Sequence, residues 1–250
     1  MIGIKEVLLA LILVGVAFGI SFLKKLDLEK DLLIGTLRSF VQLIAVGYAL
    51  ELVFDLNNLW LIFLVILIMV MVGGQTAGSR TKGSLNGFTI STFSIGVGTF
   101  FTIGGLPLLG VINADPKYVI PLAGMTIGNS TTASALALER MHSEMKSKKD
   151  QIEQALSLGV TSNQAVEHTF KATVTAAMIP TLNLMKIVGL VQLPGAMTGM
   201  ILAGASPLQA VKLQIIVVYM LICAVSISAV ITTKLSQSTY FTKYHQLVIS

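Results

Sequence analysis

The sequence is short of cysteine, histidine and charged residues, and each shortage excludes a class of protein. A single cysteine, Cys223, excludes an intrachain disulfide framework. The three histidines have none of the spacings that are typical of metal sites, so a metalloenzyme is not indicated. Charged residues make up only 12% of the chain, about half of their share in an average soluble domain, and lipid is therefore the expected solvent for most of it.

Apolar residues, in contrast, make up 54% of the 250 residues and gather in long runs. A helix needs about 20 mostly apolar residues to cross the hydrocarbon core of a bilayer. The runs predict an all-α, polytopic membrane protein with about seven transmembrane helices, at residues 7–23, 32–53, 58–77, 86–112, 117–138, 187–205 and 209–233. The sixth run contains Leu193-Pro194-Gly195, which predicts a broken or re-entrant helix.

The lysines and arginines favour one orientation of these helices. They gather after the first, third and fifth runs and in the C-terminal tail, whereas the connections on the other side hold few of them. Because cytoplasmic loops are enriched in positive charge, the N-terminus is predicted outside and the C-terminus inside a bacterial inner membrane. This asymmetry accounts for the net charge of +5, and no basic stripe with interleaved aromatic residues indicates a nucleic acid partner.

The longest polar stretch, residues 139–175, separates the fifth and sixth runs on the predicted cytoplasmic side. Its apolar positions have helical spacing up to Gly159, a residue that suits the position after the end of a helix. Thr161 and Gln164 then have the spacing of a capping box, which predicts a second helix from about Ser162 onward. The stretch is therefore predicted to be a cytoplasmic helix–turn–helix.

The pattern Glu153-Gln-Ala155-x3-Gly159 in this stretch is similar to the EAA loop of ABC-importer permeases, which docks into a cleft of the ATP-binding subunit. The similarity assigns Glu153, Ala155, Leu158 and Gly159 to ATPase coupling; the alternative is an ordinary amphipathic surface helix. Residues 78–84 resemble a phosphate-binding P-loop but lack its essential lysine, so ATP and magnesium are expected on a partner ATPase. The chain itself is predicted to hold no cofactor and no catalytic residue.

Polar side chains inside the predicted spans are costly and therefore indicate function or close helix packing. Arg38 and Gln42 lie four residues apart on one face of the second span, and Met125, Asn129 and Thr132 share one face of the fifth. We predict that these five residues line a substrate path. Two alternatives remain open: Arg38 extends its long side chain to the membrane interface, and Asn129 hydrogen-bonds a neighbouring helix.

Several strings of residues occur in order along nearly the whole chain. They are Arg38-Ser-Phe-Val-Gln42-Leu, Pro121-Leu-Ala-Gly124-Met125-Thr-Ile-Gly128-Asn129-Ser130, Glu153 to Gly159, and Gly189-Leu-Val-Gln-Leu-Pro194-Gly195-Ala-Met197-Thr198-Gly199 followed by Gln214. With them the chain resembles the FetB family of ABC permeases, which includes a bacterial permease assigned to iron export and plant half-transporters of aluminium tolerance. The resemblance implies a permease that pairs with a separate cytosolic ATPase.

Together these features predict that residues 1–250 form a single transmembrane permease domain, which assembles as a homodimer with ATPase subunits. Its expected activity is export of a small solute such as iron by ATP-driven alternating access, although no cluster of Asp, His or Cys within the spans indicates a metal site. Two rivals remain open, a secondary transporter and a non-transport protein with seven helices. A secondary transporter usually has a carboxylate inside the membrane or a repeated half, and neither is evident here.

Overall fold

The computed structural model describes residues 4–56, 58–80, 86–113, 115–242 and 244–248, and this part of the chain is helical apart from short connections. The all-α prediction is therefore confirmed. The chain divides into two compact units, Met1–Asn58 and Leu59–Ser250. The prediction of a single domain over residues 1–250 stays a prediction.

The first unit is a helical hairpin of α1 (Ile4–Lys24) and α2 (Glu29–Leu56). The Ser21 hydroxyl donates to a carboxylate oxygen of Glu29 at 2.6 Å and accepts from the backbone N–H of Leu28 at 3.3 Å. These two bonds tie the end of α1 to the start of α2. Both helices expose many large apolar side chains, as helices that face lipid do.

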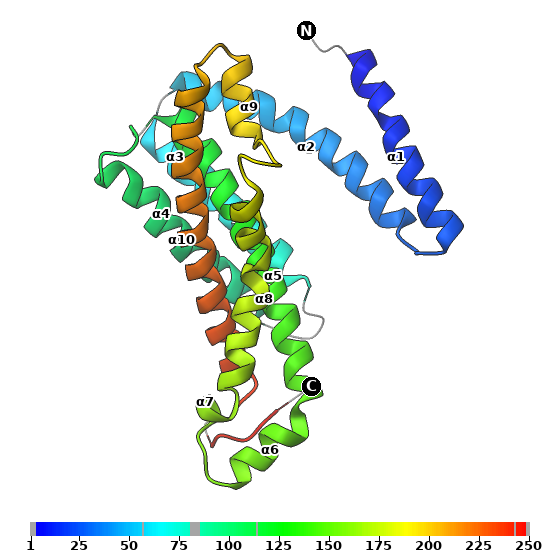
Figure 1. Cartoon of the computed structure of the whole chain (residues 1–250), viewed down its shortest axis with the longest axis vertical. Coiled ribbons are helices and arrows are strands. Elements are labelled where there is room, and N and C mark those ends of the chain that lie inside the picture. The colour runs from blue at the N-terminus through cyan, green and yellow to red at the C-terminus, as the bar shows by residue number, and fades with distance from the viewer. Residues whose placement is uncertain (1–3, 57, 81–85, 114, 243, 249–250) are drawn as a thin grey trace. The chain divides into compact units, whose positions relative to one another are not determined.

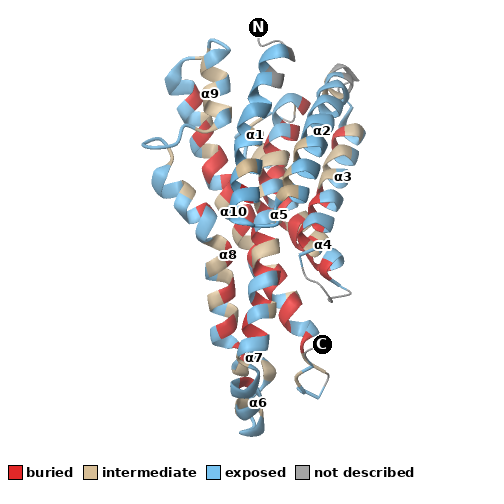
Figure 2. Cartoon of the chain, turned by 90° about the vertical axis from the view of Figure 1, so that its right-hand side faces the viewer, coloured by how far each residue is buried: buried red, intermediate tan, exposed pale blue. Residues whose placement is uncertain are grey.

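The second unit is a bundle built from the long helices α3 (Leu59–Gly78), α4 (Gly87–Leu108), α5 (Pro116–Ser147), α8 (Glu167–Ile187) and α10 (Pro207–Thr239). Helix α10 packs against α4, α5 and α8, and α3 packs against α4 and α5 (Figure 1). Figure 2 shows that buried positions of this unit concentrate along α4, α5 and α10. Helices α5 and α10 therefore form its centre.

Small and hydroxyl-bearing residues occupy much of the interior of this bundle. Gly98 of α4 lies so close to α10 that a Cβ atom there would meet the carbonyl oxygen of Ala224 at 2.8 Å and the hydroxyl of Ser228 at 2.5 Å. The Thr232 hydroxyl of α10 donates to the Ser134 hydroxyl of α5 at 3.0 Å. Because lipid removes the hydrophobic driving force between helices, such close contacts and hydrogen bonds hold a membrane bundle together.

Four helical stretches in the described part of the chain are long and apolar enough to cross a membrane: Glu29–Glu51, Leu59–Gly78, Gly87–Leu108 and Pro207–Thr239. They coincide with the second, third, fourth and seventh predicted spans. Helix α1 adds a shorter apolar stretch, Leu9–Lys24. A multi-pass membrane protein is thus confirmed, whereas the count of seven spans and the N-out orientation stay predictions.

The predicted sixth span, residues 187–205, is not one continuous helix. After the end of α8 the chain turns at Gly189, which has a φ of +83°, and α9 (Gly195–Leu202) is only eight residues long. At 1.5 Å per residue α9 is about 12 Å long, too short to cross a hydrocarbon core of about 30 Å. The predicted break in the sixth run is confirmed.

The helix–turn–helix is shorter than the predicted cytoplasmic stretch 139–175, because α5 and α8 extend into both ends of that stretch. It occupies residues 149–165. Helix α8 packs along α5 and α10 and buries Thr173 and Ala177. Charged and polar residues near its two ends lower its hydropathy, namely Glu167, His168, Lys171, Asn183 and Lys186. They conceal in the sequence a helix of 21 residues, or about 32 Å, that is long enough to span a bilayer.

Candidate functional site

The helix–turn–helix segment, residues 149–165, consists of α6 (Lys149–Ser157), a tight turn and α7 (Ser162–Ala165). Gly159 in the turn has a φ of +87°, a left-handed conformation that glycine adopts without the strain of a side chain. The Thr161 hydroxyl accepts from the backbone N–H of Gln164 at 3.4 Å, and the Gln164 side chain accepts from the backbone N–H of Thr161 at 2.9 Å. The predicted turn glycine and capping box are both confirmed.

An apolar cluster seats this segment against the long helices. Ile152 of α6 is 2% exposed, and it belongs to a cluster with Met141 and Met145 of α5, Val166 at the start of α8 and Tyr240 at the end of α10. Full burial of one such side chain contributes about 1.5 to 3 kcal/mol. Helix α6 is thus attached to α5, α8 and α10 at once, so that a force on the segment reaches the bundle.

Ionic contacts reinforce the end of α5 beside the segment. The buried Glu144 carboxylate pairs with Arg140 and with Lys148, each at 2.6 Å. A hydrogen bond from Lys148 is the main reason that the pKa of the Glu144 carboxyl lies below its usual value, and the charges of Lys148, Arg140 and His168 add to this effect while burial opposes it. The carboxylate is therefore ionised at neutral pH and holds both cations against the last turns of α5.

The described residues of the C-terminal tail, 240–242 and 244–248, fold back onto the helix–turn–helix segment, a contact that we did not predict from the sequence. Phe241 and Leu247 form a β-bridge and pack against the apolar cluster around Ile152. His245 Nδ1 lies 3.0 Å from the hydroxyl of Ser162 in α7. The sequence signal for this contact is the presence of apolar residues at both ends of an otherwise polar tail.

Helix α10 also holds α7 directly. The side-chain oxygen of Asn163 accepts from the Lys234 ammonium at 2.9 Å and from the Gln237 amide at 3.0 Å. The part-buried bond from Gln237 contributes about 1 kcal/mol to stability, whereas water competes for the exposed bond from Lys234 and reduces its contribution. The two ends of the helix–turn–helix segment are therefore both fixed to the bundle, α6 by apolar packing and α7 by hydrogen bonds.

The turn of the segment presents an exposed apolar tip. Leu158 is 85% exposed, and the neighbouring Gly159 is exposed as well. Glu153 projects from α6 with a loose ion pair to Lys149 at 3.8 Å, and Ala155 is half-buried. A rigid unit with an apolar tip has the form that docking into a cleft of a partner requires. The assignment of Glu153, Ala155, Leu158 and Gly159 to ATPase coupling stays a prediction.

The predicted substrate path is divided between the two units. Arg38 and Gln42 are exposed on α2, whereas Met125, Asn129 and Thr132 lie on α5, where Thr132 is exposed and the other two are half-buried. The Asn129 amide donates to the Met125 carbonyl of its own helix at 2.8 Å. This bond satisfies one amide hydrogen without a neighbouring helix, so it gives no support to the alternative role in interhelical hydrogen bonding. The path itself stays a prediction.

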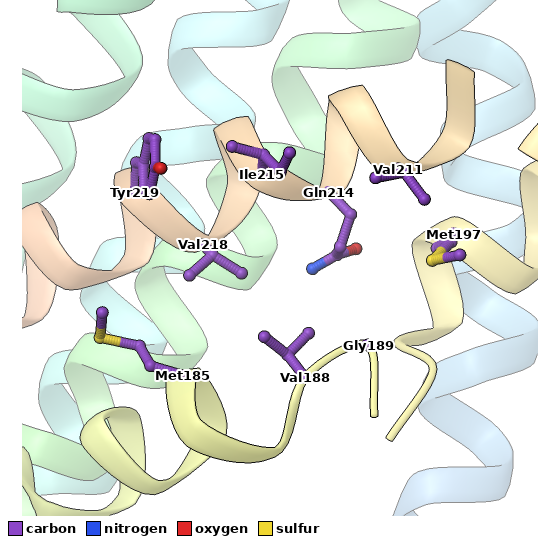
Figure 3. Close-up of a pocket in the computed structure, with 9 residues that line it drawn as sticks. All are labelled: Met185, Val188, Gly189, Met197, Val211, Gln214, Ile215, Val218 and Tyr219. Atoms are coloured by element: carbon purple, nitrogen blue, oxygen red, sulfur yellow. The ribbon is translucent and has the colours of Figure 1, made fainter. Parts of the chain in front are cut away.

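A cavity of about 440 Å³ lies at the other end of the bundle, between the end of α8, the following turn, α9 and the start of α10. Figure 3 shows its lining, which includes Met185 and Val188 near the end of α8, Met197 of α9, and Gln214 and Tyr219 of α10. Sequence reasoning did not identify this site, because its residues are mostly apolar, apart from Gln214 and the Tyr219 hydroxyl, and come together only through the turn between α8 and α9.

The buried polar group of the cavity is Gln214, whose side chain is almost entirely enclosed. The residue is 7% exposed, and its side-chain oxygen finds no hydrogen-bond partner among the residues that the structure describes. A buried polar atom left in this state costs about 1 to 3 kcal/mol. The lining therefore has two polar side chains, the Gln214 amide with its unpaired oxygen and the Tyr219 hydroxyl, in an otherwise apolar wall.

The bundle defines the class of this protein as a multi-pass α-helical membrane protein. Across the described ranges, no three side chains of His, Cys, Asp or Glu gather closely enough to hold a metal ion. The chain belongs to the uncharacterised protein family UPF0014, whose family model matches residues 4–241.

Its relatives include proteins from bacteria and plants. The chain is 39% identical over 98% of its length to the protein named "Probable iron export permease protein FetB" of Escherichia coli (strain K12), of which 95% is covered. It is 38% identical to "Protein ALUMINUM SENSITIVE 3" of Arabidopsis thaliana, with 98% of this chain and 90% of that protein covered. The "UPF0014 membrane protein YjkA" of Bacillus subtilis (strain 168) is 38% identical, with 96% of each chain covered. The resemblance to the FetB family is thereby confirmed, and no solved structure matches the chain.

Proposed function

We propose that this chain is the membrane-spanning permease subunit of an ABC transporter in a bacterial inner membrane. Two copies assemble with two separate cytosolic ATPase subunits, which bind ATP and magnesium, and alternating access exports a small solute. The name of the Escherichia coli relative makes iron one candidate for that solute. The observation that carries the proposal is the helix–turn–helix segment, a capped unit with an exposed apolar tip that is fixed to α5, α8 and α10.

The contacts of the segment supply a route for coupling. The turn at Gly159 and the capping box fix α6 and α7 to each other, so the segment moves as one body when an ATPase subunit displaces its tip. Ile152 passes that displacement to α5, and Asn163 passes it to α10. These two helices form the centre of the bundle, where a change of packing alters access from either side of the membrane.

The proposed orientation predicts which sides of the membrane the two ends of α5 reach. With Cys223 replaced by serine, a single cysteine at Lys117 should react with an impermeant thiol reagent added outside, and one at Lys149 should react only after the membrane is opened. Both positions are exposed; Lys117 lies at the start of α5 and Lys149 directly after its end, and the 32 residues of α5 give a length of about 48 Å, more than the hydrocarbon core of a bilayer. Labelling of intact cells and of inverted vesicles measures the difference. The reverse pattern would contradict the N-out, C-in topology.

The partner ATPase is tested by affinity purification of the tagged chain from mild detergent. We expect a P-loop ATPase to be recovered in a near-stoichiometric amount, and we expect Leu158→Asp to reduce its recovery at least about tenfold, because a charge replaces the apolar tip at the centre of the docking contact. Quantitative mass spectrometry of the purified complex gives the ratio of the two subunits.

Leu190→Asp provides the matched control for that experiment. Leu190 is 89% exposed and lies in the turn after α8, at the end of the bundle away from the helix–turn–helix segment. Leu190→Asp makes the same chemical change as Leu158→Asp at a similarly exposed position, and it should leave ATPase recovery unchanged. If neither the wild-type chain nor this control retains an ATPase after chemical cross-linking, the secondary-transporter alternative replaces the proposal.

A further inference from the structure

The cavity beside Gln214 combines an apolar lining with one polar atom that the described residues leave unsatisfied. Figure 3 shows the carboxamide of Gln214 extending from α10 into the space between Val188, Val218 and Met197. Its Oε1 atom is buried and without a hydrogen-bond partner in the described part of the chain. Because buried polar atoms are nearly always paired by protein, water or ligand, this oxygen marks a position where a donor is expected.

We propose that this cavity is a binding site for a small, uncharged and largely apolar molecule, which donates one hydrogen bond from a hydroxyl or amide group to Oε1 of Gln214. Its apolar body lies against Met185, Val188 and Met197. A volume of about 440 Å³ falls in the range of small-molecule sites. The unbranched methionine side chains adapt to ligands of different shape, which suits a site that accepts a chemical class and not one compound.

The lining argues against a charged ligand. The nine described residues that line the cavity include no carboxylate, imidazole, thiol or cationic side chain. An ion that enters such a site loses its hydration and gains at most the Gln214 amide and the Tyr219 hydroxyl from the lining side chains, which do not compensate for the loss. A lone water molecule is also a poor occupant, because it needs two to four polar partners and most of this wall is apolar.

The proposal stands apart from the coupling to an ATPase, since binding is measured on the permease alone. The test uses the purified full chain in phosphatidylcholine nanodiscs with 3-azioctanol, an aliphatic alcohol whose diazirine attaches to nearby residues on illumination. We expect adducts on the peptide that contains Met185 and Met197, and a loss on the order of fivefold in Gln214→Met, which is what removal of one neutral hydrogen bond gives.

Gln209→Met is the matched control, because Gln209 is an exposed glutamine of the same helix that lies outside the cavity lining. It should leave the adduct yield at Met185 and Met197 unchanged.

The melting temperature separates this role from a structural one: Gln214→Met removes an unpaired buried amide, so it should keep or raise the melting temperature while the labelling falls. Three results would overturn the proposal. The first is equal labelling of Gln214→Met and Gln209→Met, and the second is labelling of the wild-type chain by an azi-octane without the hydroxyl that equals its labelling by 3-azioctanol. The third is a fall in the melting temperature of Gln214→Met.

Competition identifies the source of the hydroxyl. Excess 1-octanol should suppress the adducts whether the natural ligand is a free solute or a lipid, because it shares the proposed chemistry. Nanodiscs that contain dioleoylglycerol should suppress them further only if a hydroxyl-bearing lipid enters the cavity from the bilayer. Suppression by octanol alone assigns the site to a small free molecule, and suppression by neither overturns the site.

Discussion

Gly98→Ala is expected to lower the free energy of unfolding by about 1 to 3 kcal/mol, even though alanine is the better helix former. The added methyl group would meet the carbonyl oxygen of Ala224 and the hydroxyl of Ser228 at distances that Cβ atoms do not adopt. The Ala224 oxygen belongs to the backbone of α10, so it cannot rotate away, and α4 must separate from the helix at the centre of the bundle. Thermal unfolding of the detergent-purified chain measures the loss.

Gly104→Ala is the control on the same helix. A Cβ atom at Gly104 meets nothing within 4 Å, so the substitution should raise stability by up to about 1 kcal/mol through helix propensity alone. The two substitutions are chemically identical and opposite in expected sign. A stabilised Gly98→Ala variant would contradict the close contact between α4 and α10.

Gly159→Val is expected to break the coupling between ATP hydrolysis and transport while leaving the bundle folded. A β-branched residue at a φ of +87° is strained by about 1 to 3 kcal/mol, which the turn relieves by changing the angle between α6 and α7. The tip then no longer fits the proposed ATPase cleft, and we expect ATPase recovery and solute-dependent ATP turnover to fall about tenfold or more. Turnover in proteoliposomes and recovery of the complex are the two measurements.

Gly110→Val controls for backbone strain as such. Gly110 has a φ of +67° in the connection after α4, and neither glycine has an atom within 4 Å of its added Cβ, so both substitutions act through the backbone and not through a clash. Normal turnover in Gly110→Val together with reduced turnover in Gly159→Val would support the coupling role. Unchanged association and turnover in Gly159→Val would remove the helix–turn–helix segment from the mechanism.

Local features of this fold were predictable because their physical causes lie within a few residues of sequence. The left-handed turn at Gly159 and the capping box of Thr161 and Gln164 depend on the backbone freedom of glycine and on a spacing of three residues. Helices α2, α3, α4 and α10 were likewise evident, since their length and hydropathy alone mark them as candidate membrane spans.

Features that depend on tertiary packing were not predictable. Helix α8 begins inside the polar stretch 139–175, and only its contacts with α5 and α10 explain why Thr173 and Ala177 are interior positions. The cavity around Gln214 and the attachment of His245 to Ser162 join residues from different helices or from the tail. The proposed substrate path is a comparable case. Arg38 and Asn129 belong to separate units, and their separation in the sequence does not give the distance between them in space.

The length of α5 has a mechanical consequence. This helix runs without interruption from Pro116 to Ser147 and carries Asn129 near its middle and the seat of the helix–turn–helix segment at its end. In the proposed coupling this helix serves as a lever: tilting a rod about 48 Å long by about 10° displaces one end relative to the other by about 8 Å. Pro121 removes one backbone hydrogen bond near the far end, which gives the lever a natural pivot. In the proposed coupling, a tilt of this size about Pro121, imposed at the helix–turn–helix end, moves Asn129, which lies about 12 Å along the helix from the pivot, by about 2 Å.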